Sequence, residues 1–139
     1  MQSANYDSPL TVQGNSAGEA IPVTATFGVA TTGGASMLFD SDGDNTAQTV
    51  KASAGTLYTL EVQNPNGSDA YFQLFDASAP TIGTTVPNQS YIVPANGAMD
   101  KTFGAAGIAF ATAIKYACTT TATGSGDPTT GLVVNATYK

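Results

Sequence analysis

The clearest pattern of hydrophobic and polar positions lies in residues 56–76, TLYTLEVQNPNGSDAYFQLFD. In the first part, Tyr58, Leu60 and Val62 alternate with polar residues, which is the period of a strand with one buried face. In the second part, Phe72 and Leu74 point to one face and Tyr71 and Phe75 to the other, so both faces carry apolar side chains. The segment NPNGSD between them forms turns readily, because proline fixes φ and glycine adopts a positive φ at little cost. This pattern predicts a long β-hairpin at the centre of a β-sandwich.

Shorter alternating runs on both sides of this segment predict further strands. The additional expected strands are residues 20–29, 35–39, 46–52, 90–94, 98–103, 107–119 and 131–139. The turn ANG at residues 95–97 should pair its two neighbouring strands as a second hairpin. In GIAFATAIKYACT, alanine favours a helix, but β-branched and aromatic residues at every second position favour a strand.

Two of the connections between these predicted strands are long loops. Residues 77–89 contain two prolines and a glycine, and their length predicts a crossover from one sheet edge to another. Residues 120–130 form a loop rich in glycine, serine, threonine and proline. With about eight to ten short strands and no expected helix, the chain is predicted to be all-β, a single-domain β-sandwich of jelly-roll or Greek-key type.

The N-terminal residues 1–18 contain few large apolar groups, so we place the sandwich domain at residues 19–139. One interpretation of residues 1–18 is a short edge strand with a loose terminus. The other is an arm that becomes ordered against a neighbouring subunit, with Tyr6, Leu10 and Val12 as its candidate contacts. Both interpretations stay open at this stage.

The charge of the chain indicates which kinds of molecule it can bind. Only 10% of the 139 residues are charged, the net charge is −6, and the chain has four lysines and no arginine. Nucleic acid is excluded as an expected partner, because binding to phosphates needs clustered basic residues. So few charges also reduce repulsion against self-association or docking onto a large surface.

Segments for membranes and export are not expected. No apolar run approaches the roughly 20 residues that span a bilayer, and the first ten residues lack the pattern of a signal peptide. We therefore expect synthesis in a cytoplasm, followed by retention there or release inside a larger assembly. The lone Cys118 lies in an apolar run, which predicts a small buried hydrophobic residue.

The acidic cluster of Asp40, Asp42 and Asp44 permits two interpretations. Its spacing resembles the start of a calcium loop, but Asn45 occupies the glycine position of such a loop and Lys51 occupies the glutamate position. An Asp- and Gly-rich hairpin turn is therefore favoured over a calcium site.

The chain lacks some of the residue types that enzymes use for catalysis. The chain has no histidine, the commonest general base and a frequent metal ligand. Glu61 with Asp76 or Asp100 could be nominated as a glycosidase pair, but isolated acids at turns and strand exteriors are typical of solvated surface groups. We expect no enzyme, no catalytic residue, no metal and no cofactor.

Sugar binding by exposed aromatic rings is an alternative. Six tyrosines are present without any tryptophan, and most of them fit strand positions that core or edge packing explains.

Four segments carry a family resemblance. They are SAGTLYTLEVQNPNGSDAYFQLFDASAPTIGTTVP, YIVPANGAM, GIAFATAIKYACTT and LVVNATYK. Together they make the region from about residue 54 to residue 139 resemble a group of small structural proteins encoded by tailed bacteriophages. The likeness consists of strands, turns and small residues and includes no catalytic signature. The N-terminal region takes no part in it.

The resemblance implies a virion component. This is either a decoration or cement protein on the outer capsid surface, or a head-fibre, neck or tail accessory protein. Phage decoration proteins are often small β-sandwiches or barrels that bridge capsomers, commonly as trimers, and reinforce the shell against DNA pressure. The implied partners are the major capsid protein, copies of the chain itself, or both, after synthesis in the cytoplasm of the host bacterium. The contacts are expected at the N-terminal region and at the loops of residues 40–45 and 120–130.

Overall fold

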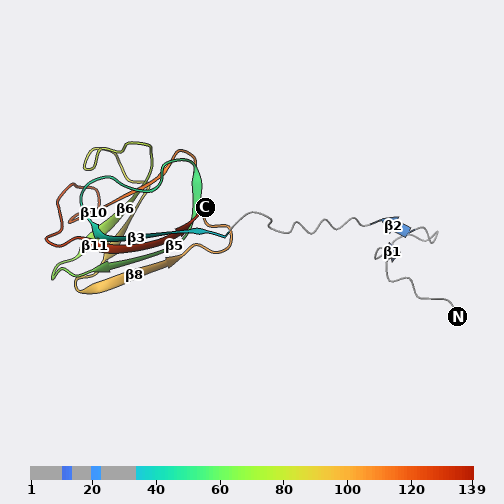
Figure 1. Ribbon diagram of the computed structural model, residues 1–139, viewed down its shortest axis with the longest axis horizontal. Helices are drawn as coiled ribbons and strands as arrows, with labels where there is room; N and C mark the ends of the chain where they lie inside the picture. Colours follow the sequence, from blue (N-terminus) through green and yellow to red (C-terminus); the bar gives the residue numbers. More distant parts are fainter. Residues whose placement is uncertain (1–10, 14–19, 23–33) are drawn as a thin grey trace. The chain divides into compact units, whose positions relative to one another are not determined.

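A computed structural model of the chain describes residues 11–13, 20–22 and 34–139 (Figure 1). The chain divides into two compact units, residues 1–33 and residues 34–139. In the first unit, β1 (Thr11–Gln13) pairs antiparallel with β2 (Ala20–Pro22). The strand expected at residues 20–29 is therefore described only in its first three positions.

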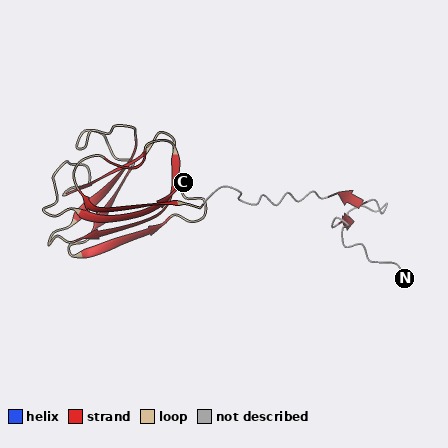
Figure 2. Cartoon of the chain, in the orientation of Figure 1, coloured by secondary structure: helices blue, strands red, loops and turns tan. Residues whose placement is uncertain are grey.

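The second unit is an all-β sandwich of nine strands in two antiparallel sheets, and no helix occurs among its residues (Figure 2). The predicted fold class is confirmed. The strands are β3 (Ser36–Gly43), β4 (Gln48–Lys51), β5 (Gly55–Asn64), β6 (Ala70–Asp76), β7 (Gln89–Val93), β8 (Gly97–Thr102), β9 (Ile108–Phe110), β10 (Ile114–Thr119) and β11 (Leu132–Tyr138).

The strand pairs are nested along the sequence. β6 pairs with β7, β5 with β8, β4 with β10 and β3 with β11, as in one long hairpin. Rolling up that hairpin brings β10 beside β6 and β11 beside β5. The sheets then have the orders β4-β10-β6-β7 and β3-β11-β5-β8, and β9 pairs with the start of β5. This is the topology of a jelly roll.

The hairpin predicted at residues 56–76 is wrong. Its two strands form as expected, but β5 lies in one sheet and β6 in the other, so the segment NPNGSD crosses between the sheets. The side chain of Asn64, which is only 2% exposed, holds this crossing. Its Nδ2 donates to the carbonyl oxygens of Ser68 at 2.9 Å and Val93 at 3.0 Å, and its Oδ1 accepts from the backbone N–H of Asn66 at 3.0 Å.

The connection predicted as a crossover is, by contrast, a long hairpin loop. Residues 77–88 join β6 to its antiparallel neighbour β7 within one sheet. The hairpin predicted around residues 95–97 is also wrong, because β7 and β8 lie in different sheets. A hairpin turn was favoured for the Asp-rich segment, but Asp40 and Asp42 lie within β3, and residues 44–47 join β3 to β4 across the sandwich. Turn residues indicate that the chain reverses, but they do not determine which sheet the next strand joins.

The single strand predicted at residues 107–119 is two strands, β9 and β10, which lie in different sheets. Asp76 fixes the bend between them. Its carboxylate accepts hydrogen bonds from the backbone N–H groups of Ala111 at 2.8 Å, Thr112 at 2.7 Å and Ala113 at 3.3 Å. These hydrogen bonds lower the pKa of Asp76, because they stabilise its charged form. Strand was correctly favoured over helix, but this acidic anchor is distant in the sequence.

A bulge changes the register of β5. Thr137 lies opposite Thr59 and Tyr138 opposite Leu57, so Tyr58 is an extra residue between them. Leu57 is therefore fully buried and Tyr58 only partly, although Tyr58 was expected to share the buried face of Leu60 and Val62. The backbone N–H of Phe103 donates to the carbonyl of Tyr58 at 2.9 Å, at the interruption between β8 and β9.

The core lies between the two sheets. Phe72 of β6 stacks on Tyr116 of β10 with ring centroids 5.1 Å apart. Cys118 is fully buried, as predicted, and burial raises the pKa of its thiol. The largest fully buried apolar side chains of this core are Tyr116, Phe72, Leu57, Leu60, Leu74, Ile114, Leu132, Val62, Val93 and Val134.

Candidate binding face

The outer face of the sheet β4-β10-β6-β7 is covered by its own chain. On its two central strands, Gln73, Phe75, Ala117 and Thr119 are all fully buried, although they alternate with the core residues. The Nε2 of Gln73 donates to the hydroxyl of Thr119 at 2.8 Å and to carbonyl oxygens of the 120–130 loop, at 3.1 Å. In Figure 1, loops gather on the side of β10 and β6. This sheet therefore offers little of its central surface to a partner.

The outer face of the sheet β3-β11-β5-β8 is open, and we call it the open face. At its edge, Met37 and Phe39 of β3 are 83% and 68% exposed. Strand register places them in two rows that cross the sheet, since Phe39 lies opposite Asn135 and Met37 opposite Thr137. Exposure of two large apolar side chains on one strand is typical of a contact surface.

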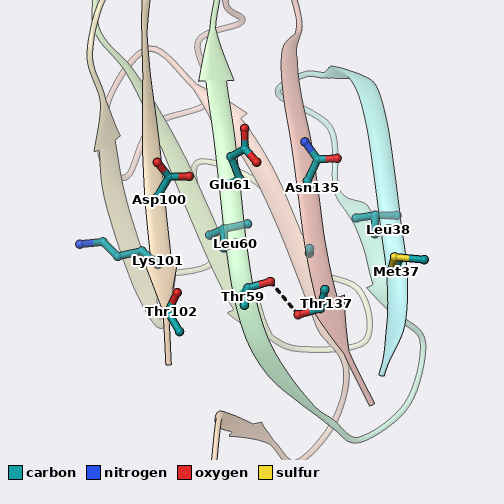
Figure 3. A pocket seen from close by; sticks show the side chains of 11 residues that line it. Met37, Leu38, Thr59, Leu60, Glu61, Asp100, Lys101, Thr102, Asn135 and Thr137 are labelled. Atoms are coloured by element: carbon teal, nitrogen blue, oxygen red, sulfur yellow. Dashed lines mark hydrogen bonds between the residues drawn. The ribbon is translucent and has the colours of Figure 1, made fainter. Parts of the chain in front are cut away.

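Polar side chains fill the remainder of the two rows. Asn135 lies opposite Glu61 and Glu61 opposite Asp100, while Thr137 lies opposite Thr59 and Thr59 opposite Thr102. The hydroxyl oxygens of Thr59 and Thr137 are 2.6 Å apart and share a hydrogen bond, drawn as a dashed line in Figure 3. The rows line an open concavity of about 380 Å³. The lining residues are Met37, Leu38, Thr59, Leu60, Glu61, Asp100, Lys101, Thr102, Asn135, Ala136 and Thr137.

Two carboxylates are adjacent on this face. Glu61 of β5 lies directly opposite Asp100 of β8, and like charges in this position repel one another. The Nε2 of Gln63 donates to Oε1 of Glu61 at 2.9 Å. Of the acids considered in the sequence, Glu61 and Asp100 are brought together, whereas Asp76 lies in the other sheet and binds backbone N–H groups. The open face thus presents hydroxyl, amide and carboxylate groups next to an apolar edge, an arrangement suited to binding.

The Asp-rich segment uses its carboxylates internally. Asp40 lies within β3, where its carboxylate accepts hydrogen bonds from the hydroxyl of Tyr116 at 2.5 Å and the backbone N–H of Asp42 at 2.9 Å. Asp44 accepts from the hydroxyl and the backbone N–H of Thr46, at 2.6 and 2.8 Å. The hydroxyl hydrogen bond is the main cause that lowers the pKa of Asp44. Within residues 34–139 and the described parts of the first unit, no group of three Asp, Glu, His or Cys side chains is placed to hold a metal ion.

The two loops that we expected to make contacts lie against each other. The Nδ2 of Asn45 donates to the carbonyl of Ser125 at 2.7 Å, and its backbone N–H donates to Oδ1 of Asp127 at 3.4 Å. The backbone N–H of Cys118 also donates to the carbonyl of Asp44, at 2.7 Å. Residues 40–43 belong to β3, and the segment that follows them is joined to the 120–130 loop through Asn45.

The other candidate contacts have different outcomes. Tyr6 and Leu10 lie outside the described residues, and Val12 is described only in its backbone, opposite Ile21. The five described tyrosines are all buried or half-buried, in agreement with packing roles. One of them, Tyr91, packs under the Nζ of Lys101, which lies 5.3 Å from the ring centroid.

Met37 and Phe39 were missed as candidate contacts. The sequence did contain a signal, because both alternating sets of residues 36–40 include large apolar groups, Met37 and Phe39 in one and Leu38 in the other. An edge strand with one buried face must expose one such set.

No protein-family model, curated protein or solved structure matches this chain. None of the described residues belongs to a helix that is long and apolar enough to cross a membrane.

Proposed function

We propose that this chain is a structural virion protein, a capsid decoration or cement protein that binds the outer capsid surface and stabilises the shell. The resemblance of its C-terminal region to small structural proteins of tailed phages supports this role. The jelly-roll sandwich supports it as well, because this architecture also forms viral capsid domains.

The observation that carries the proposal is the contrast between the two outer faces. The centre of one is buried under its own chain, while the other exposes Met37 and Phe39 beside polar rows. Burying a methionine or phenylalanine side chain contributes about 1.5–3 kcal/mol. The proposed partners are the major capsid protein, copies of the chain itself, or both. A lasting interface would need to bury about 1,000 Å² or more.

The test uses phage capsids that lack this protein. Adding the chain at saturating concentration should raise the temperature at which these capsids release their DNA, and the chain should sediment with them. Asn135→Lys, in the middle of the open face, and Phe39→Ser, at its edge, should each weaken co-sedimentation at least tenfold. Val86→Ser is the matched control, because Val86 is 79% exposed on the loop between β6 and β7.

Two results would contradict the proposal. Capsid stability that does not change after saturating addition rules out the cement role. Co-sedimentation that is unchanged by Asn135→Lys and Phe39→Ser removes the open face as the capsid contact. Negative-stain images of virions labelled through a tag on this protein would show whether it lies on the head, or on the neck, tail or head fibre.

Carbohydrate binding is the second candidate, and the concavity favours it. Hydroxyl, amide and carboxylate side chains line it, and the exposed ring of Phe39 adjoins them in the same row. Such groups bind sugar hydroxyls, and an aromatic ring stacks on a sugar. A glycan array followed by calorimetry tests this function, with Glu61→Gln expected to abolish binding and Val86→Ser to preserve it.

A further inference from the structure

β3 is the longest edge strand of the sandwich, and its first half, residues 36–39, is its unprotected part. Its eight residues exceed the four of β4, the five of β7 and the six of β8. Edge strands are usually protected by lysine, proline, interruptions or short length. β4 contains Lys51, β7 ends before Pro94, and β8 contains Lys101. β3 contains neither lysine nor proline, and its register shift, between Asp40 and Gly43, lies in its second half.

The two halves of β3 differ in charge. Residues 36–39, SMLF, are uncharged, and the acids Asp40 and Asp42 occupy the second half. Met37 and Phe39 point to the open face and are exposed, while Leu38 packs partly against the core. In the described part of the chain, β3 has one neighbouring strand, β11.

We propose that two copies of this chain associate through β3, in antiparallel register about a two-fold axis at Leu38. Met37 of each copy then lies opposite Phe39 of the other, and Ser36 lies opposite Asp40. The contact is isologous, since the same surface serves both copies. Backbone groups at the open edge gain hydrogen bonds, and the two sheets join into one.

Charge excludes the registers centred on the second half of β3, and the pairing of apolar side chains selects the axis at Leu38. An axis at Asp40 would place the two Asp40 carboxylates opposite each other, and an axis at Ser41 would place Asp40 opposite Asp42. Like charges directly opposite on neighbouring strands are unfavourable. An axis at Leu38 avoids every such pair. It also places Met37 of each copy opposite Phe39 of the other, which an axis at Met37 or at Phe39 does not. A methionine sulfur beside an aromatic ring adds a favourable contact.

The association has a geometric consequence. The open faces of both copies lie on the same side of the joined sheet, so the dimer presents one surface of twice the area. The inference does not depend on the virion role, and its two-fold symmetry differs from the trimer that the family resemblance led us to expect.

The test measures self-association of the full-length chain by analytical ultracentrifugation, without capsids. The wild type should sediment as a concentration-dependent dimer. Met37→Lys and Phe39→Glu should each weaken dimerisation at least tenfold. The double variant Met37→Lys with Phe39→Glu should restore it, because opposite charges then face each other in both pairs.

Matched controls separate this pattern from general effects. The double variant Met37→Lys with Phe39→Lys changes the same positions but should stay monomeric, because like charges face each other. Asn135→Lys and Val86→Ser should leave the dimer intact. Circular dichroism and thermal melting confirm that each variant is folded.

Three outcomes would overturn the inference. The wild type could remain monomeric up to millimolar concentration, or the single variants could leave dimerisation unaffected. In the third outcome, Met37→Lys with Phe39→Glu would restore dimerisation no better than Met37→Lys with Phe39→Lys. A monomer in which the β3 amides that point away from β11 are protected from hydrogen exchange would identify another segment of the same chain as the occupant of this edge, and would likewise overturn it.

Discussion

The carboxylate of Asp76, at the end of β6, accepts a hydrogen bond of 2.7 Å from the backbone N–H of Thr112, in the bend between β9 and β10. Together with the bonds from Ala111 and Ala113, it joins the two sheets at a point where the chain changes sheet. Replacement of the charged acceptor should therefore affect the whole sandwich.

Asp76→Asn should lower the melting temperature at pH 7, because an amide oxygen is a weaker acceptor than a carboxylate. The folded-state pKa of Asp76 lies below its ordinary value of 3.8. Its stabilisation is therefore complete above the unfolded pKa and is lost as the pH falls through the folded pKa. The difference in melting temperature between wild type and Asp76→Asn should shrink from pH 7 towards pH 2.5. Asp42→Asn, at an exposed acid of β3, is the control and should change the melting temperature little.

Gly107→Ala should be much more destabilising than Gly104→Ala. Both glycines have positive φ, 65° and 74°, and a left-handed conformation costs an L-residue about 1–2 kcal/mol. A Cβ on Gly104 meets open space, whereas a Cβ on Gly107 would lie 2.7 Å from the carbonyl oxygen of Leu57. We expect about 1–2 kcal/mol for Gly104→Ala and about 2–5 kcal/mol for Gly107→Ala, measured by urea unfolding. Equal losses would contradict close packing of this turn on β5.

Asn64→Ala should destabilise the fold by about 2–4 kcal/mol, because it leaves buried carbonyl groups without a donor. Asn64→Asp should be worse at pH 7, since its carboxylate would face the carbonyl oxygens of Ser68 and Val93. Protonation relieves that repulsion, so this variant should gain stability relative to wild type as the pH falls towards 4. Urea unfolding at pH 7 and pH 4 measures both effects, with Ser68→Ala, at an exposed position of the same connection, as the control. A loss after Asn64→Asp that did not depend on pH would contradict the assigned orientation of the amide.

Removal of one carboxylate from the pair Glu61 and Asp100 should stabilise the protein. Glu61→Gln and Asp100→Asn should each raise the free energy of unfolding by about 0.2–1 kcal/mol at low salt, because the two acids lie opposite each other. The double variant should gain little more than either single variant, since one substitution already removes the repulsion. Unfolding at 0.02 M and 1 M NaCl checks this, because salt should abolish the gain. Fully additive gains would contradict direct repulsion.

The sequence predicts the strands well and their pairing poorly. The alternation in β5 and β11 and the aromatic and β-branched positions of β10 are local features, and they identify strands correctly. The partner of β5 depends on contacts far along the chain, such as those of Asn64 with Val93. The bulge at Tyr58 also depends on a distant part of the chain, because Tyr58 lies beside the interruption between β8 and β9.

The binding face was predictable only in part. The exposure of Phe39 follows once β3 is known to be an edge strand with Leu38 on its inner side, and strand order cannot be derived from local alternation. Register likewise brings Glu61 opposite Asp100, although they are distant in sequence. The burial of Cys118, by contrast, follows from the apolar run around it and was predicted correctly.

The nested pairing also has a kinetic consequence. β3 and β11 are the first and last strands of the sandwich, yet they lie side by side, so their pairing closes a loop that contains nearly the whole domain. Such closure is entropically costly, and folds dominated by distant contacts form slowly, on a scale of milliseconds to seconds. The pair β6 and β7 closes the shortest of the nested loops and is the natural place for folding to begin. β3 would then reach its place late, which leaves a newly made chain free to meet other chains before its edge is in position.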